Sequence, residues 1–234
     1  MTAGLFPTLF SAGASPQPPH APRHPVHPGW PEVTPTVLLA DGASLRLRPL
    51  TRKDGARWRQ LRLMNQEHLL PVEPTVDSTW EAAHTVASWR TMMHYLKNSA
   101  ANGDIVPFAI ELDRQFVGQL TLGNIVHGVQ KDCWIGYWVD HAITGRGIAK
   151  AAVALGVDHA FGRVGLHRVT ATYLPANPAS GAVLAANGFT QEGVLRRNLH
   201  INGAWQDHLF MALVIDDFTT TAVERMRTAG VIRT

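Results

Sequence analysis

Hydrophobic and polar residues alternate in some stretches of the chain and recur at helical spacing in others. Alternation with period two over 45–48 predicts a strand, and the apolar run 37–39 before Asp41-Gly42 predicts a partner for it. Further strands are expected at 106–112, 116–122, 133–139, 167–174, 189–201 and 205–215, and helices at 53–64, 80–96, 147–161, 179–186 and 220–227. This order predicts an α/β (α+β) fold in one domain with a mixed sheet.

Short polar and glycine-containing segments mark the ends of these elements. Ser78-Thr79-Trp80-Glu81 has the spacing of a capping box that opens the second long helix. Asn187-Gly188 is typical of a helix stop, and Asn202-Gly203 favours a tight turn between the last two strands. The segment 69–74 contains two prolines, so it is expected to leave the helical conformation.

Composition narrows the class of protein. The chain has 234 residues, of which 45% are hydrophobic and 17% charged, enough to bury a sizeable core. Cys133 is the single cysteine, which excludes an intrachain disulfide framework and a four-cysteine zinc site. No apolar stretch reaches the roughly 18–20 residues of a membrane-spanning helix, and the first residues lack the positive start of a secretory signal. We therefore expect a cytoplasmic protein without membrane contact.

Residues 1–35 differ from the rest of the chain. They hold nine of the fifteen prolines and two charged residues, Arg23 and Glu32. Because proline removes backbone donors, this segment is expected to be a flexible tail, followed by one domain over 36–218 and a C-terminal extension over 219–234. Three histidines in the tail, at positions 20, 24 and 27, lack an ordered scaffold, so no metal site is predicted.

The charge of the chain is mildly basic. The formal net charge is +3 with twelve histidines counted as neutral. This balance permits an acidic or phosphorylated partner without requiring one. No run of five or more Lys or Arg occurs, so a nucleic-acid-binding arm is not predicted.

A glycine-rich loop precedes the helix expected at 147–161. Its sequence is Thr144-Gly145-Arg146-Gly147-Ile148-Ala149. Glycines let backbone N–H groups approach a ligand, and a helix N-terminus supplies unpaired N–H groups and partial positive charge, so the loop can hold a pyrophosphate. Arg146 can add charge next to a phosphate. The alternative is an ordinary glycine loop.

Two other phosphate motifs do not fit this loop. A dinucleotide fingerprint needs a third glycine where the chain has Lys150, and a P-loop needs a Gly-Lys-Ser/Thr triplet that the sequence lacks. A nicotinamide enzyme and an NTPase are therefore not expected.

A second polar segment, 174–180, follows the strand expected at 167–174. It contains Asn177 and Ser180, whose spacing places them on one face at the start of the next helix. The Asn177 side chain is suited to hydrogen-bond amide groups of a ligand. The alternative is that Asn177 is an N-cap or turn residue.

These motifs, in this order, resemble the GCN5-related N-acetyltransferases, and more narrowly their RimJ/RimL branch of ribosomal-protein-alanine N-acetyltransferases. The resemblance covers about 36–216. It rests on the glycine loop, on the Asn177-x-x-Ser180 pair, and on several shorter segments. These are Leu70-Pro71-Val72-Glu73-Pro74, Gly136-Tyr137-Trp138-Val139, His167-Arg168-Val169, Tyr173-Leu174-Pro175-Ala176-Asn177, Asn187-Gly188-Phe189, Glu192-Gly193 and Trp205-Gln206-Asp207-His208.

The resemblance implies a splayed, mostly antiparallel sheet of about seven strands with acetyl-CoA in the gap. Backbone groups of Trp138 and Val139 would pair with the pantetheine arm, and Asn177 would face it near the thioester. The pyrophosphate would lie on the backbone amides of Gly145, Arg146, Gly147, Ile148 and Ala149. The reaction it implies is direct attack of an amine on the thioester.

The catalytic candidates also come from this resemblance. Glu73 is the first candidate base, with a structural brace as its alternative. Asp207 and His208 are further candidates at the acceptor end, and Ser180 is the candidate acid; the backbone N–H near Val139 is the expected oxyanion donor. Two family residues are absent: a tyrosine acid is replaced by Leu184, and a RimL-type glutamate by Leu199.

The expected acceptor is the N-terminal α-amine of a ribosomal or other cytosolic protein with Ala or Ser first. An α-amine has a pKa of roughly 7.7–8.0 and a lysine about 10.4, so the former needs only a modest base. Two alternatives stay open: acetylation of a small amine (an amino acid, polyamine or drug), and a non-catalytic CoA-binding or ribosome-associated module. The protein is expected to be a monomer or a homodimer.

Overall fold

The structure is a computed structural model that describes residues 2–3 and 31–233. Most of the expected N-terminal tail lies outside the described residues. The helices are α1 (Gly55–Met64), α2 (Gln66–Leu69), α3 (Trp80–Ala83), α4 (Val86–Asn102), α5 (Ile148–Asp158), α6 (Pro178–Ala186) and α7 (Ala222–Thr228). The strands are β1 (Thr2–Ala3), β2 (Val37–Leu38), β3 (Ser44–Pro49), β4 (Val106–Leu112), β5 (Gln115–Val126), β6 (Asp132–Val139), β7 (Arg168–Tyr173), β8 (Thr190–Ile201) and β9 (Ala204–Val214).

One mixed sheet runs through the molecule. Its strand order is β2-β3-β4-β5-β6-β7-β9-β8, and β1 pairs with β6 beside this path. Within the described residues only β6 and β7 pair in parallel, so the prediction of a mixed, mostly antiparallel sheet is confirmed. The two-residue strands β1 and β2 bring the sheet above the expected seven strands.

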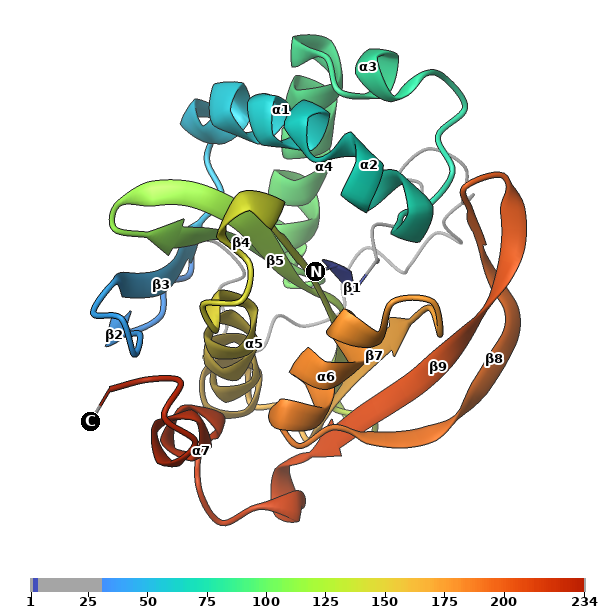
Figure 1. Cartoon of the computed structure of the whole chain (residues 1–234). Coiled ribbons are helices and arrows are strands. Elements are labelled where there is room, and N and C mark those ends of the chain that lie inside the picture. The colour runs from blue at the N-terminus through green and yellow to red at the C-terminus, as the bar shows by residue number, and fades with distance from the viewer. Residues whose placement is uncertain (1, 4–30, 234) are drawn as a thin grey trace.

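The two faces of the sheet carry separate hydrophobic cores. One core joins α5, α6 and α7 to sheet residues such as Leu120 and Ile135, and the other joins α1 and α4 to Phe116 and Trp138. In Figure 1, α5, α6 and α7 lie together below the group formed by α1, α2, α3 and α4. The sheet therefore has a helical layer on each side.

Small residues let α5 approach the sheet closely. A Cβ added at Gly156 would lie 3.1 Å from side-chain atoms of both Ile135 and Leu120. The helix also contains four buried alanines, at 149, 151, 152 and 154. This close packing holds α5, which begins directly after the glycine loop, against the sheet.

Two expected helices differ from the structure. The helix predicted over 80–96 is divided into α3 and α4, because Thr85 caps a new helix by accepting a hydrogen bond from the Ser88 N–H. The cap of α3 is Thr79, which accepts from the Ala82 N–H, rather than the expected Ser78. The helix predicted over 147–161 ends its α-helical part at Asp158 and continues as a π-helical turn, His159–Val164.

Both ends of the described chain pack onto the domain. Ala222 and Met226 of α7 and the following Ile232 are buried in the larger core, so the expected C-terminal extension is part of the domain's packing. Near the other end, Glu32 and Thr34 are buried, and the Thr34 hydroxyl accepts a hydrogen bond from the Leu47 N–H. The described residues just before position 36 thus lie against β3.

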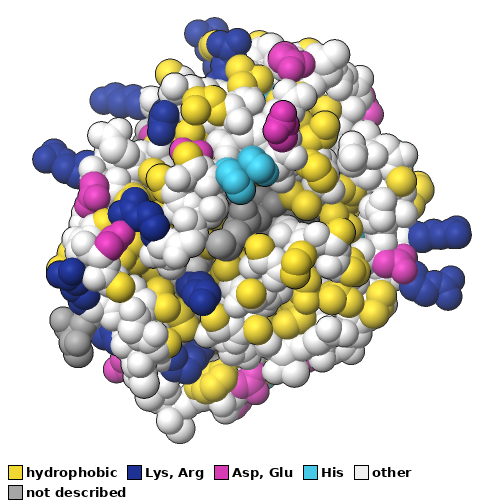
Figure 2. All heavy atoms as spheres, viewed as in Figure 1, with side chains coloured by type: hydrophobic (Ala, Val, Ile, Leu, Met, Phe, Trp, Pro, Cys, Tyr) yellow, Lys and Arg dark blue, Asp and Glu magenta, His cyan; other side chains and the backbone are white. Residues whose placement is uncertain are grey.

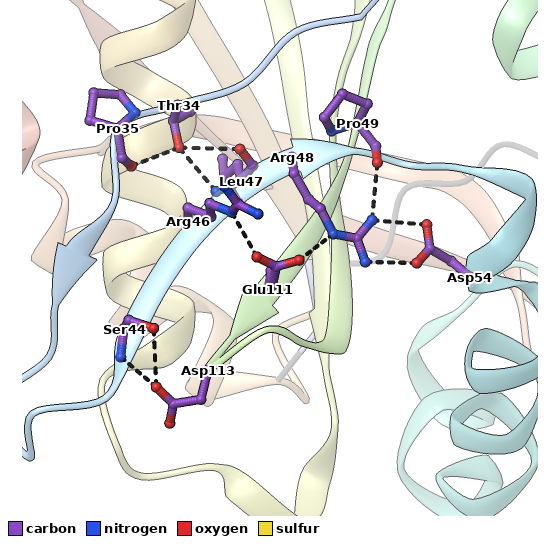
Figure 3. A network of polar contacts seen from close by, with 10 residues as sticks. All are labelled: Thr34, Pro35, Ser44, Arg46, Leu47, Arg48, Pro49, Asp54, Glu111 and Asp113. Atoms are coloured by element: carbon purple, nitrogen blue, oxygen red, sulfur yellow. Dashed lines mark hydrogen bonds and ion pairs between the residues drawn. The ribbon is translucent and has the colours of Figure 1, made fainter.

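Charged side chains tie β3 to β4 and to the first helical turn (Figure 3). Glu111 accepts hydrogen bonds from Arg46 Nε at 2.7 Å and from Arg48 Nε at 2.5 Å. The Arg48 guanidinium also binds both carboxylate oxygens of Asp54, at 2.9 and 2.7 Å. Burial acts to raise the pKa of Glu111, but the two arginines hold it below its ordinary value of 4.5.

We expect Glu111→Gln to lower the free energy of unfolding by about 1.5–3 kcal/mol at pH 7, because two arginines lose a charged acceptor. A carboxylate with a lowered pKa stabilises the fold above its unfolded pKa and loses this effect as the pH falls. The difference from wild type should therefore shrink when urea unfolding is repeated below pH 4.5. The exposed Glu67→Gln serves as the control, and an equal loss of stability there would contradict the assignment.

No helix in the described part of the chain is long and apolar enough to cross a membrane. Among the same residues no group of three or more His, Cys, Asp or Glu side chains is arranged to hold a metal ion.

Candidate active site

The sheet opens between β6 and β7. The two strands pair in parallel only over Asp132, Cys133 and Trp134, and the rest of β6 has no β7 partner. The backbone of β1 pairs with this free edge instead, with Thr2 opposite Trp138 and Ala3 opposite Tyr137. The edge therefore accepts an extended chain, which is the property that a pantetheine arm requires.

The glycine loop turns into α5 through two left-handed residues. Gly145 has φ +85° and Gly147, the N-cap of α5, has φ +80°. A Cβ at Gly147 would lie 2.9 Å from Val231 Cγ1. Because the first intrahelical bond runs from the Ala151 N–H to the Gly147 carbonyl, the preceding N–H groups point out of the helix end. Glycine is required at position 147 for both conformation and space.

A cavity of about 550 Å³ lies against this loop. It is lined by the loop, by Val139 at the end of β6, by α6 and by the segment before β3. The lining residues are Ala40, Asp41, Val139, Thr144, Gly145, Arg146, Gly147, Ile148, Ala149, Lys150, Ala179, Ala182, Val183, Gly230 and Val231. Six of the eight residues predicted to bind the donor are among them; Trp138 and Asn177 are not.

Charged side chains surround the cavity mouth. Arg146 forms an ion pair with Asp41, with Nη2 2.6 Å from Oδ2. The Ala43 backbone N–H and Arg146 together hold the pKa of Asp41 below its ordinary value. Lys150 lies in the first turn of α5 and also lines the cavity. In the sequence, the position of Lys150 three residues after Gly147 excludes a dinucleotide fingerprint but does not by itself indicate a place in this cavity.

The candidate acid Ser180 is fully buried at the start of α6. Its hydroxyl lies 3.3 Å from the Tyr137 hydroxyl, and burial raises the pKa of that phenol above its ordinary value. Asn177 is the N-cap of α6, and its Oδ1 accepts from the Ser180 N–H at 3.3 Å. The structure thus gives Asn177 the capping position, and it brings Ser180 to the strand edge that carries Tyr137 and Trp138.

The candidate base Glu73 lies in a buried ion pair. Arg62 of α1 binds both of its carboxylate oxygens, and both side chains are less than a tenth exposed. The Arg62 guanidinium thus occupies both carboxylate oxygens of Glu73. The geometry gives Glu73 bracing contacts, which are the alternative to a catalytic role.

Asp207 and His208 are neighbours in β9 with opposite surroundings. Asp207 is exposed, and its Oδ1 accepts from the Arg197 N–H at 2.7 Å, where Arg197 has φ +46° in a bulge of β8. His208 is 1% exposed, and its Nδ1 lies 3.1 Å from the Gln206 carbonyl oxygen. A carbonyl only accepts, so Nδ1 carries the proton and Nε2 keeps its lone pair.

Burial lowers the pKa of His208 below its ordinary value of 6.5, against the opposing effects of the Gln206 carbonyl and Asp207. The imidazole is therefore neutral at pH 7. A neutral imidazole with Nε2 unprotonated can accept a proton, whereas both carboxylate oxygens of Glu73 are bound to Arg62.

The register of the sheet places the candidate acid Ser180 and the candidate base His208 on opposite faces. Tyr137 and Ser180 belong to the α5 and α6 side. Trp138 points to the other side, and so do Thr172, which pairs with Phe210, and His208, two residues before Phe210 in β9. The candidate acid and the candidate base therefore lie on opposite faces of the sheet.

Buried polar atoms on the His208 side lack partners. Among the described residues, the Gln119 amide, Trp138 Nε1 and Thr172 Oγ1 are buried with no hydrogen-bond partner. Gln119 pairs with Trp138 and thus shares its face. Unpaired buried polar atoms are costly, so a water molecule or a polar ligand is expected to supply hydrogen bonds to them on this face. The sequence pattern did not single them out, because strand register decides which side each one faces.

Two histidines at the surface were also not predicted. The exposed rings of His68 in α2 and His141, just after β6, stack with centroids 3.4 Å apart. Figure 2 shows histidine side chains side by side at the surface of the molecule. Burial and the neighbouring His68 lower the pKa of His141. The two residues are far apart in the sequence, and only the fold brings them together.

The cleft between two diverging parallel strands and the glycine-lined helix start define a site for a CoA-type donor. The residues 44–190 match the acetyltransferase (GNAT) domain family. The structure superposes on Mycobacterium smegmatis RimJ in complex with CoA-disulfide with a TM-score of 0.85 and 45% identity, covering 88% of this chain and 98% of that chain.

Two curated relatives are also named as N-acetyltransferases. The [ribosomal protein uS5]-alanine N-acetyltransferase of Escherichia coli (strain K12) is 27% identical over 193 residues, 82% of this chain and 97% of that protein. The probable N-acetyltransferase YjcK of Bacillus subtilis (strain 168) is 41% identical over 105 residues, which span 45% of this chain and 58% of that protein.

The chain belongs to the GNAT acetyltransferase family and to its RimJ/RimL-like members. It is an acyltransferase that uses acetyl-CoA as donor. The predicted family, donor and fold class are confirmed.

Proposed function

We propose that this enzyme acetylates the N-terminal α-amine of a protein, ribosomal or other, with Ala or Ser as the first residue. The observation that carries the proposal is the neutral imidazole of His208, which lies on the sheet face opposite Tyr137 and Ser180. The names of the similar RimJ and uS5-alanine enzymes support a ribosomal protein terminus as the acceptor.

A neutral histidine is a strong enough base for an α-amine acceptor. An α-amine with a pKa of roughly 7.7–8.0 is partly neutral at pH 7, whereas about one lysine in a thousand is. A neutral histidine is sufficient to take the proton from an α-ammonium group, directly or through a water molecule. The same base would be poorly matched to a lysine side chain.

The chemical step follows from these positions. The amine nitrogen forms a bond to the thioester carbonyl carbon, and the proton that it loses passes to His208 Nε2. The N–H near Val139 stabilises the developing oxyanion. The C–S bond then breaks, and the thiolate leaves on the side of Ser180 and Tyr137, whose paired hydroxyls supply a hydrogen bond or a proton.

The unpaired atoms near His208 fit the acceptor's backbone. A peptide N-terminus offers an ammonium group, N–H donors and carbonyl acceptors within its first two residues. Gln119 provides both a donor and an acceptor, Trp138 Nε1 a donor, and Thr172 either. We assign this face to the first residues of the acceptor.

The donor half of the proposal is tested by a thermal melt with and without acetyl-CoA. At 100 times its dissociation constant a ligand adds about 2.7 kcal/mol. For a chain of this length that corresponds to a rise in Tm of roughly 5–11 °C. NAD is the control, because the loop lacks the third glycine of a dinucleotide site. An equal rise with NAD, or none with acetyl-CoA, would contradict the assignment of the glycine loop.

A further inference from the structure

A buried arginine and glutamate connect the helical layer to the donor strand. Arg62 in α1 is 5% exposed and Glu73, just after a short 3-10 turn (Leu70–Val72), is 6% exposed. Nη1 and Nη2 of Arg62 bind the two carboxylate oxygens of Glu73. A planar, bidentate pair of this kind fixes orientation as well as distance.

The third nitrogen of the guanidinium is also used. Arg62 Nε donates to His84 Nε2 at 3.0 Å, and His84 Nδ1 lies 2.6 Å from the Trp80 carbonyl oxygen. Burial, followed by the charge of Arg62, lowers the pKa of His84 to about 4, so this imidazole is neutral and accepts from Arg62. All three nitrogens of the Arg62 guanidinium are thus hydrogen-bonded, which fixes its position and orientation.

Three tryptophan rings surround the same guanidinium. Its central carbon lies 4.9 Å from the ring centre of Trp80, 5.3 Å from that of Trp138 and 5.8 Å from that of Trp58. Trp138 is the residue whose backbone edge faces the opening between β6 and β7. A cation desolvated against an indole face attracts it strongly, so Arg62 fixes the ring and with it the backbone of the donor strand.

The Glu73 end of the pair leads to the acceptor side. The next residue, Pro74, bridges to Ile201 at the end of β8. The Thr75 N–H donates to the His200 carbonyl at 2.8 Å, and the Thr75 hydroxyl lies 2.9 Å from both His200 Nδ1 and the Gly203 nitrogen. The segment that carries Glu73 is therefore fastened to the β8–β9 hairpin, which carries His208.

We infer that Arg62 and Glu73 are positioning residues, which hold the donor strand and the acceptor hairpin in the relative placement that the reaction requires. The inference rests on the proposed function for its acceptor half. Neither residue is assigned contact with a reacting atom. Glu73 acts through Arg62 on Trp138 and through Pro74 and Thr75 on the hairpin, and it is not the base of the reaction.

The test uses Glu73→Gln in the full chain, with acetyl-CoA and a peptide that begins with Ala. The expected result is an increase of about tenfold in both the Kd of acetyl-CoA and the KM of the peptide, because a displacement far from the chemistry weakens both sites together. The acid limb of the kcat pH profile stays where it is in the wild type. A general base would give a different result: kcat falls at least about 100-fold, and the acid limb is lost.

Glu67→Gln is the matched control, since Glu67 lies exposed in the same region and outside the pair. Arg62→Met/Glu73→Leu, which leaves no unpaired buried charge, covers the case in which Glu73→Gln does not fold. The double variant should fold and show the same two increases. Wild-type values for both constants in either folded variant would overturn the inference.

The binding measurement with acetyl-CoA and the transfer assay with the peptide together distinguish a failure of this inference from a failure of the proposed function. If the wild type transfers no acetyl group to the peptide, the proposed acceptor is wrong, and the Kd of acetyl-CoA still decides whether the pair positions Trp138. If transfer is efficient and neither constant changes in the variants, the proposed function stands and the positioning role is wrong.

Discussion

Replacing His208 with glutamine is expected to lower kcat by about 100-fold at pH 7, because general-base catalysis contributes roughly 10²–10⁴ to such reactions. The neutral imidazole would be lost while the side chain keeps a similar size. Burial holds the pKa of His208 below 6.5, so the wild-type rate should fall only as the pH drops below that value. In the variant the defect should shrink toward pH 9, where solution deprotonates an α-ammonium group without help. Initial rates with an Ala-first peptide between pH 5.5 and 9 measure this.

Asp207→Asn is the matched control for this experiment. Asn retains an oxygen that can accept from the Arg197 N–H, so the bulge in β8 is preserved. Its kcat should stay within about threefold of wild type, which is well under 1 kcal/mol. A large loss in Asp207→Asn together with a small one in His208→Gln would move the base from His208 to Asp207.

Gly147→Val is expected to weaken acetyl-CoA binding by about 30- to 100-fold. The residue has φ +80°, a conformation that costs a β-branched side chain roughly 1–3 kcal/mol, and its Cβ would lie 2.9 Å from Val231 Cγ1. The backbone has to move, and the N–H groups at the start of α5 then no longer point toward the pyrophosphate. Isothermal titration with acetyl-CoA gives the affinity.

The control for the glycine substitution is Gly162→Ala. A Cβ at Gly162 meets no atom within 4 Å, and the residue lies outside the left-handed region. It should bind acetyl-CoA like the wild type. Equal affinity in Gly147→Val, at unchanged Tm, would show that the glycine loop is not the donor cradle.

The features that sequence predicted well have local causes. A short stretch of sequence is enough to recognise Gly145, Gly147 and the apolar face of α5, since tight turns and helix starts depend on neighbouring residues. The same holds for the Asn202-Gly203 turn between β8 and β9. The family resemblance predicted eight donor-binding residues, and six of them line one cavity in the structure.

The features that sequence did not predict depend on distant residues. Arg62 and Glu73 meet because α1 and the loop after it fold back over Trp138. His68 of α2 likewise meets His141, which follows β6. No spacing rule shows such pairs. The tautomer of His208 depends on one backbone carbonyl, and the break between α3 and α4 depends on a single threonine cap. These contacts decide which candidate base is free to act: the sequence put Glu73 first, ahead of Asp207 and His208, and the ion pair of Glu73 with Arg62 favours His208 instead.

The most direct test of the central claim is mass spectrometry of an Ala-first or Ser-first peptide that also contains an internal lysine, after incubation with enzyme and acetyl-CoA. The account predicts one acetyl group per peptide, located on the N-terminal nitrogen by fragment ions, with His208→Gln much slower. Acetylation of the lysine instead, or of spermidine with the peptide untouched, would contradict it.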